Sequence, residues 1–221
     1  DSSFKSGKGP NAHVVKVNIQ KDGKILLGGL FTSYDGIVVK GIVRLNSNGS
    51  FDDSFKCGTG TNSNVYAIEL QHDKKVLIGG YFTAYNGVQN NHILRVNSDG
   101  TIDDSFTADF DSSVHSITVQ LDGKIIVGGK FTKCNGKIAN RIIRLEADGT
   151  IDSTFNIGSG ANKIVRTIVV KKDSKIIIGG DFTELNGASI LYFAFLNQNG
   201  SLDSSSFQEN GFDAAVKSIV T

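Results

Sequence analysis

The chain has 221 residues, of which 23 are basic and 22 acidic, and its formal net charge is +1. This balance gives no electrostatic reason to expect nucleic acid or an anionic membrane surface as a partner. Apolar runs stay far below the roughly 18 residues that a membrane-spanning helix needs, so we expect no membrane insertion. The 26 glycines, set against one proline, predict many turns.

The chain opens with the end of one repeat and continues with a complete one. Residues 1–4 match the closing element of a preceding repeat. The first full repeat, residues 14–55, predicts four strands, A to D, at about 14–20, 24–31, 41–46 and 50–55. Strand A alternates apolar Val15, Val17 and Ile19 with polar residues, as a half-buried strand does.

Turn dipeptides separate these strands. Asn-Gly and Asp-Gly between apolar runs are strong hairpin signals, because both central residues of a type I′ turn need positive φ. In the first repeat these dipeptides are Asp22-Gly23, Asp35-Gly36 and Asn48-Gly49. Two later A–B turns, Asp73-Lys74 and Asp173-Ser174, lack the glycine, which weakens those single turns.

The pattern then returns at 65–106, 114–155 and 165–207, and residues 215–221 match strand A once more. Four antiparallel strands at a period of about 50 residues are typical of a β-propeller blade. We therefore predict an all-β fold, a β-propeller of four-stranded antiparallel blades. The leading D and trailing A elements cannot complete a blade together, so we expect a larger or incompletely closed propeller.

Each repeat carries a Gly-Gly pair in strand B, followed two places later by Phe-Thr. The pairs are Gly28-Gly29, Gly79-Gly80, Gly128-Gly129 and Gly179-Gly180. Glycine inside a strand indicates a close approach of another backbone or blade. We expect the Phe of Phe-Thr and the last Phe of the Asp-x-x-Phe element to fill the space between blades.

The pattern appears most fully at residues 120–155, and there the sequence resembles the delta-60 repeat, a β-propeller family of unknown function. The resemblance covers essentially the whole chain. It implies bacterial or phage proteins, often exported or surface-associated, in which the repeats serve as scaffold or binding parts. It implies no catalytic residues and no cofactor. The fourth repeat departs from the pattern at Phe195, where the others have arginine.

Few residues suggest a metal or catalytic site. The run from Asn97 to Asp103 has some likeness to a calcium loop, but it offers too few carboxylates, and a hairpin turn explains it. We expect Asp103 in that turn, like its equivalent Asp52, to accept hydrogen bonds from backbone N–H groups. The four histidines do not have metal-ligand spacing, so we predict no metal. Cys57 and Cys134 occupy unrelated repeat positions, and their redox state stays open.

The repeated arginines Arg44, Arg95 and Arg144 have two interpretations. They could form a basic ring, or they could pair with the closing-element aspartates between strands or blades. We favour the structural pairing. The strand-A position occupied by Val15, Tyr66, His115, Arg166 and Lys217 varies from repeat to repeat and could line a channel mouth.

The D–A and B–C loops should share one face of a propeller, and their residues vary between repeats. Exposed Tyr, Arg and His residues suit recognition of glycans or proteins. The candidate ligand-binding residues are Tyr34, Lys40, Tyr66, Tyr85, His92, His115, Arg141, Arg166 and Tyr192.

We therefore predict a non-catalytic binding or adhesion module that is extracellular, on a cell surface or in a virion. One alternative is a purely architectural propeller that contacts neighbouring subunits in a surface appendage or phage tail. A remote alternative is an enzyme with a site in the central channel.

Overall fold

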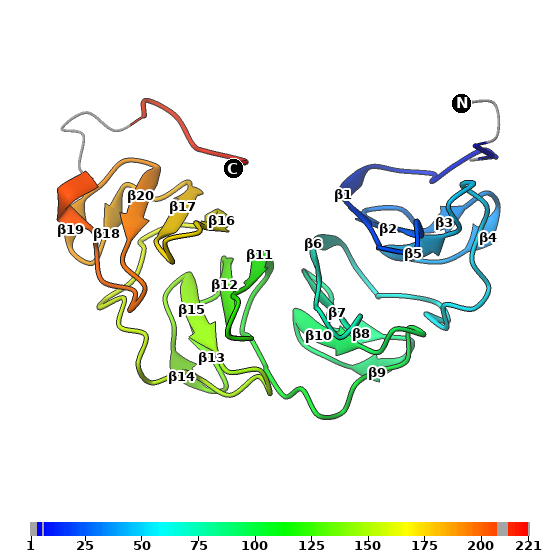
Figure 1. Ribbon diagram of the computed structural model, residues 1–221, viewed down its shortest axis with the longest axis horizontal. Coiled ribbons are helices and arrows are strands. Elements are labelled where there is room, and N and C mark those ends of the chain that lie inside the picture. The colour runs from blue at the N-terminus through cyan, green and yellow to red at the C-terminus, as the bar shows by residue number, and fades with distance from the viewer. Residues whose placement is uncertain (1–3, 6, 207–211, 221) are drawn as a thin grey trace. The chain divides into compact units, whose positions relative to one another are not determined.

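The computed structural model describes residues 4–5, 7–206 and 212–220. The chain forms two compact units, residues 1–106 and 107–221, which run from blue to green and from green to red in Figure 1. Strands dominate both units, and a short 3₁₀ turn, η1, spans Ser204–Ser206. The part of the chain that the structure describes has no helix of the length and hydrophobicity needed to span a bilayer.

The first unit contains the first two repeats. The strands of the first repeat are β1 (Val14–Ile19), β2 (Ile25–Gly29), β3 (Ser33–Tyr34), β4 (Ile37–Val38) and β5 (Ile42–Leu45). Those of the second are β6 (Val65–Leu70), β7 (Val76–Gly80), β8 (Ala84–Tyr85), β9 (Val88–Gln89) and β10 (Ile93–Val96).

The second unit contains the third and fourth repeats. The strands of the third repeat are β11 (Val114–Val119), β12 (Ile125–Gly129), β13 (Lys133–Cys134), β14 (Lys137–Ile138) and β15 (Ile142–Leu145). Those of the fourth are β16 (Val165–Val170), β17 (Ile176–Gly180), β18 (Glu184–Leu185), β19 (Ala188–Ser189) and β20 (Phe193–Leu196).

Every repeat is built as one antiparallel blade with a small side ribbon. Three strands form the main sheet, for example in the order β1-β2-β5, and the B–C loop folds into a two-stranded ribbon such as β3-β4. Strand D is shorter than predicted. It consists of a single β-bridge, which joins Leu45 and Phe51 in the first repeat. The predicted propeller blades are confirmed, with three long strands and a minimal fourth.

Two kinds of turn join the strands. In the B–C ribbon both residues have positive φ, as at Asp35 (47°) and Gly36 (81°), which confirms type I′ geometry. At the A–B and C–D turns only one residue does, for example Gly23 at 82°, so the type I′ prediction is wrong there. The Gly23 N–H bonds to the Gln20 carbonyl, as in a three-residue turn that ends in a left-handed residue.

The Gly-Gly pairs allow neighbouring repeats of one unit to pack closely. A Cβ on Gly28 would lie 2.6 Å from Ile68 Cδ1 and 2.9 Å from Val65 Cγ1. In the second unit, a Cβ on Gly128 would lie 2.8 Å from the corresponding atoms of Ile168 and Val165. The expected close approach is confirmed, since strand A of one repeat rests on the glycine of the repeat before it.

The end segments make the same contacts as internal parts of the repeat. Phe4 lies against Gly49, as Phe55 lies against Gly100. Near the other end, Val216 covers Gly179 in the way that Val165 covers Gly128. Residues 1–3 and Thr221, which belong to the predicted terminal elements, lie outside the described residues, as does Phe207 of the fourth closing element.

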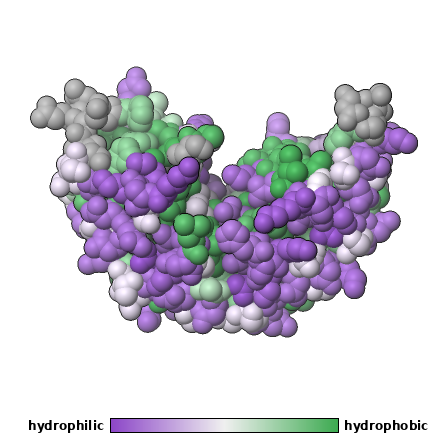
Figure 2. All heavy atoms as spheres, viewed as in Figure 1, coloured by the Kyte–Doolittle hydropathy of each residue, from purple (hydrophilic) through white to green (hydrophobic). Residues whose placement is uncertain are grey.

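Strand β1 leaves an apolar surface open on the first unit. Val17 is 52% exposed, whereas the equivalent Ile68 of the second repeat is 1% exposed against the glycine of the first. Val14, Val15 and Ile19 are exposed as well. Figure 2 shows hydrophobic residues reaching the surface at this place. Such a patch on a strand at the edge of a sheet is typical of an interaction surface.

Candidate functional site

One end of each repeat, formed by the A–B and C–D turns and called the turn end here, carries a repeated ionic cluster. In the first repeat, Asp52 Oδ2 accepts hydrogen bonds from Arg44 Nε at 2.6 Å and Lys24 Nζ at 2.8 Å. The Arg44 guanidinium lies 4.7 Å from the centre of the Phe55 ring and donates to the Ser98 carbonyl of the next repeat at 2.5 Å. The structural interpretation of these arginines is therefore confirmed.

The turn-end aspartates are held in their charged form. Burial by itself raises the pKa of Asp52, but hydrogen bonds from Lys24, Ser54 and Arg44 outweigh it and lower that pKa well below its ordinary value. The Ser54 backbone N–H also donates to Asp52, at 3.1 Å, which confirms the role expected for this aspartate. The same cluster recurs around Asp103 and Asp152, whose pKa values are lowered as well.

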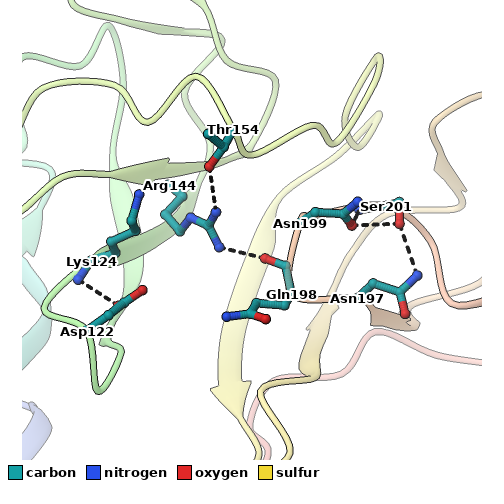
Figure 3. Close-up of a pocket in the computed structure, with 8 residues that line it drawn as sticks. All are labelled: Asp122, Lys124, Arg144, Thr154, Asn197, Gln198, Asn199 and Ser201. Carbon is teal, nitrogen blue, oxygen red and sulfur yellow. Dashed lines mark hydrogen bonds between the residues drawn. The ribbon is translucent and has the colours of Figure 1, made fainter.

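A polar pocket of about 560 Å³ opens at the turn end of the second unit (Figure 3). The residues that line it already bond to one another or to nearby residues. Arg144 donates to Asp152, Thr154 and the Gln198 carbonyl, and Asn197 and Asn199 both bond to Ser201. Because these bonds hold the turns together, we regard the pocket as part of the scaffold.

The opposite end of each repeat, called the loop end here, presents side chains from three fixed backbone positions. The first is a β-bulge in strand A. In β11, Val114 pairs with Gly129 and Ser116 with Gly128, which leaves His115 in the bulge between them. Bulges re-aim side chains next to functional sites. The same irregularity occurs at Tyr66 and Arg166.

The second position directly precedes strand C and has a left-handed backbone. Gly41 has a φ of 71°, and His92, Arg141 and Tyr192 have φ values of 68° to 70° at the same place. The left-handed region costs a non-glycine residue about 1–2 kcal/mol. Three bulky side chains are therefore retained where glycine would be less strained, which is typical of functional positions.

The third position directly follows the Gly-Gly pair and was not among the candidate residues predicted from the sequence. It was detectable, because this residue changes in every repeat while its glycine neighbours do not. Together the positions give one loop-end set per repeat, namely Val15, Leu30 and Gly41; Tyr66, Tyr81 and His92; His115, Lys130 and Arg141; and Arg166, Asp181 and Tyr192.

The second repeat has an aromatic loop-end set. Tyr81 is 57% exposed, and the centre of its ring lies 6.0 Å from that of the His92 ring, with the planes tilted by 34°. Tyr66 is half-buried, and its hydroxyl accepts a hydrogen bond from Asn64 at 3.3 Å. His92 is only 8% exposed, so Tyr81 provides the open aromatic face of this set, which can stack on a sugar or a planar side chain.

The sets of the third and fourth repeats are charged. Arg166 donates to Asp181 through Nε at 2.7 Å and Nη2 at 2.6 Å. Arg141 donates through Nη1 to the carbonyls of Lys130 and Phe131. Burial lowers the pKa of His115 to about 4, the charges of Arg166 and Lys130 act in the same direction, and Asp181 opposes them. His115 is therefore neutral at pH 7.

His115 also lies 3.0 Å from the Ser113 hydroxyl, through Nε2. This contact resembles a nucleophile and its base. However, Ser113 is only 3% exposed, and an activated nucleophile must reach its substrate. The pair is better explained as a hydrogen bond that orients the imidazole ring.

The candidate residues thus fall into three groups. Six of them, His92, Arg141, Tyr192, Tyr66, His115 and Arg166, belong to the loop-end sets. Lys40 is exposed, but its backbone pairs with the D–A loop at Thr59 and Thr61. The surface role expected for Tyr34 and Tyr85 is wrong, because they are 2% and 1% exposed and their hydroxyls donate to the carbonyls of Gly49 and Gly100.

The third repeat replaces this tyrosine with Cys134 and compensates for it. Phe110 lies 4.4 Å from Phe131, measured between ring centres, and pairs with Cys134 in a β-bridge. The amide of Asn135 donates to the Gly149 carbonyl, as the tyrosine hydroxyl does to the equivalent carbonyl in the first two repeats. Cys134 and Cys57 are buried free thiols, and burial raises the pKa of Cys134 to about 12. Both thiols are therefore unreactive.

The calcium-like run is a turn. Asp99 Oδ1 accepts hydrogen bonds from the Thr101 N–H at 3.1 Å and the Thr101 hydroxyl at 2.7 Å. The turn interpretation is therefore confirmed. Among the described residues, the structure contains no group of three or more His, Cys, Asp or Glu side chains that could hold a metal ion.

The sequence model of the DUF5122 beta-propeller, a domain of unknown function, matches residues 20–55, 71–106, 120–155 and 171–205. These segments lie in the four repeats and together cover more than half of the chain. No curated protein matches the chain.

Solved structures share the fold at low sequence identity. A protein of unknown function from Bacteroides caccae aligns over 88% of this chain and 69% of its own, with 14% identity and a TM-score of 0.50. An extracellular domain assigned to a one-component system of B. thetaiotaomicron aligns with 20% identity and a TM-score of 0.49. PorZ, a surface component of the type-IX secretion system of Porphyromonas gingivalis, aligns with 10% identity and a TM-score of 0.43.

The second alignment includes 86% of this chain, and the third includes 84%. The chain spans only 22% and 24% of those two proteins.

Proposed function

Because the chain belongs to the DUF5122 β-propeller family, whose function is unknown, we propose that it is a non-catalytic binding or adhesion module. It recognises a glycan or a protein through its loop end and works outside the cell or on the cell surface. The identification of its units as delta-60 repeats is part of the same proposal.

One observation carries this proposal. The fold fixes three backbone positions at the loop end of every repeat, yet no two repeats have the same residue at any of them. At one of these positions, His92, Arg141 and Tyr192 retain a left-handed backbone that glycine would adopt with less strain. Residues that folding does not require, held in a costly conformation, are best explained by ligand binding.

The repeats themselves provide a conservative test. The triple variant Tyr66→Val, Tyr81→Leu, His92→Gly gives the second repeat the loop-end set of the first, which already folds with Val15, Leu30 and Gly41. We expect the whole chain to bind ligands on a glycan array or in a protein pull-down, and the triple variant to lose part or all of that binding while its far-UV CD spectrum stays the same.

A matched control removes an exposed charge at the turn end, through Lys172→Leu. This control should bind like the wild type. Equal binding by the triple variant, or equal loss in the control, would contradict the proposal.

The exposed apolar strand β1 favours a second candidate, a purely architectural propeller in a cell-surface appendage or phage tail. Val17→Lys would place a charge on that strand. If the protein assembles into larger particles, and Val17→Lys abolishes assembly while the triple loop-end variant has no effect, the architectural role is the better explanation.

A further inference from the structure

The loop end of the second unit gathers charges from two adjacent repeats. Strands β11 and β16 run side by side, since Thr118 on β11 donates to the Ile168 carbonyl on β16 at 3.0 Å. Around the starts of these strands lie His115, Lys130, Arg166, Asp181 and Lys217, which we call the basic cluster. The backbone fixes this placement, because the Lys130 N–H donates to the Ser113 carbonyl, the Asp181 N–H to the Ile164 carbonyl, and the Val216 N–H, next to Lys217, to the Gly180 carbonyl. Lys130 and Arg166 act electrostatically on His115, and Arg166 and Lys217 act on Asp181.

The cations outnumber the carboxylate in this cluster. Three side chains are positively charged, one is negatively charged, and His115 is neutral at pH 7, because its pKa is lowered to about 4. Lys130 and Lys217 are exposed. A concentration of positive charge at a partly buried surface raises the local concentration of anions.

Arg166 is the side chain of the cluster whose orientation is fixed. Asp181 accepts hydrogen bonds from its Nε and Nη2, so the guanidinium plane is held in one orientation. Its Nη1 makes no hydrogen bond within the residues that the structure describes. A pre-oriented guanidinium loses less entropy when it binds a carboxylate than a mobile one does.

Tyr192 adds an aromatic face beside the charges. It is half-buried and occupies the left-handed position of the same loop-end set as Arg166 and Asp181. In the second repeat, the residue at this position is His92, and its ring lies beside that of Tyr81, the residue that follows Gly-Gly. An aromatic ring offers an apolar face to the C–H groups of a sugar, and its hydroxyl can bond to sugar hydroxyls.

We propose that the basic cluster with Tyr192 binds an acidic saccharide, with the carboxylate of a uronic acid residue held by Arg166, Lys130 and Lys217. The aromatic ring favours a sugar over an acidic peptide as the carrier of that carboxylate. This inference rests on the proposed function, because it uses the loop end as the binding surface, but it concerns residues other than those of the aromatic second repeat.

The test uses the whole chain and a tetragalacturonate probe, with binding measured by isothermal titration calorimetry. The same oligosaccharide with methyl-esterified carboxyl groups is the neutral control, and tetraglutamate is the acidic peptide. We expect the free acid to bind, both controls to bind far more weakly, and added salt to weaken the binding.

Variants taken from the first repeat locate the site. Lys130→Leu installs the residue found at Leu30, and Arg166→Val with Asp181→Leu removes the ion pair as a unit, leaving neither charge unpaired. Each should weaken tetragalacturonate binding about tenfold, as expected for the loss of one charge-assisted contact. Lys172→Leu removes an equal charge from the turn end of the same unit and should leave the affinity unchanged.

Several results would overturn this inference. They are no binding of tetragalacturonate, equal binding of its methyl ester, tighter binding of tetraglutamate, or equal loss in Lys172→Leu. The proposed function fails separately, if no array ligand or protein partner depends on Tyr66, Tyr81 and His92. A protein that binds through those residues but ignores tetragalacturonate would therefore refute this inference alone.

Discussion

The two ends of each repeat differ in what they keep constant. At the turn end, the Arg Nε to Asp Oδ2 distance is 2.6 Å in all three repeats that have the arginine. At the loop end, none of the three side-chain positions has the same residue twice. The ionic cluster at the turn end therefore serves folding, whereas the three loop-end positions vary from repeat to repeat on the same backbone.

The largest effect should come from breaking the turn-end cluster. Asp152→Ala leaves Arg144 and Lys124 without their shared carboxylate, and an unpaired buried charge costs about 3–5 kcal/mol. We expect the free energy of unfolding, measured by urea denaturation, to fall by that amount. Asp203→Ala is the matched control, because the fourth repeat has Phe195 instead of the arginine and Lys175 is half-exposed. Equal losses would show that the arginine adds little.

Acid should distinguish the two ends. The folded-state pKa of His115, about 4, lies below its unfolded value of 6.5, so its neutral form contributes stability that is present above pH 6.5 and lost as the pH falls toward 4. The turn-end aspartates, with lowered pKa values, lose their contribution only at lower pH. Between pH 7 and pH 4, we expect the wild type to lose about 3 kcal/mol more than His115→Val.

Urea denaturation at both pH values measures this difference, and NMR titration of the imidazole gives the pKa directly. Parallel loss of stability in the two proteins would mean that His115 is not kept neutral by the fold. His115→Val is a suitable comparison, because the first repeat already carries Val15 at that position.

The smallest effect concerns left-handed residues at the turn end. Lys74 has a φ of 68° where Gly123 of the third repeat has 85°. Lys74→Gly should therefore raise the free energy of unfolding by about 1 kcal/mol, and Gly123→Lys should lower it by a similar amount. Neither should alter ligand binding. A loss of binding in Lys74→Gly would contradict the assignment of function to the loop end alone.

Much of the fold could be predicted from the sequence, because its strongest signals are local. The spacing of the Gly-Gly pairs gave the repeat, and the alternation at Val15, Val17 and Ile19 gave strand A. The Asp-Gly turns were harder, since the same dipeptide forms a type I′ turn at Asp35-Gly36 and a three-residue turn at Asp22-Gly23. The length of the connection and the strand register decide between them, and neither is visible in the dipeptide.

The candidate site was less predictable, because its residues come together through the backbone. Tyr34 and His92 both read as polar aromatic residues in a variable loop, yet Tyr34 is a core side chain that donates to the Gly49 carbonyl, whereas His92 is 8% exposed and lies beside the Tyr81 ring. The alternation that would separate them is lost in the short ribbon between strands B and C. Tyr81, Lys130 and Asp181 were not predicted, because the Gly-Gly pair before each of them and the Phe-Thr pair after it are explained by packing alone.

The glycine in strand B and the valine in strand A are the two halves of one joint, and every copy of the repeat carries both. A duplicated copy therefore already contains the glycine on which the next copy packs and the valine that packs on the copy before it. Unequal recombination within such a gene can add or remove a whole blade without inventing a new contact. Each added blade also brings one more loop-end set, in which a new binding specificity can evolve.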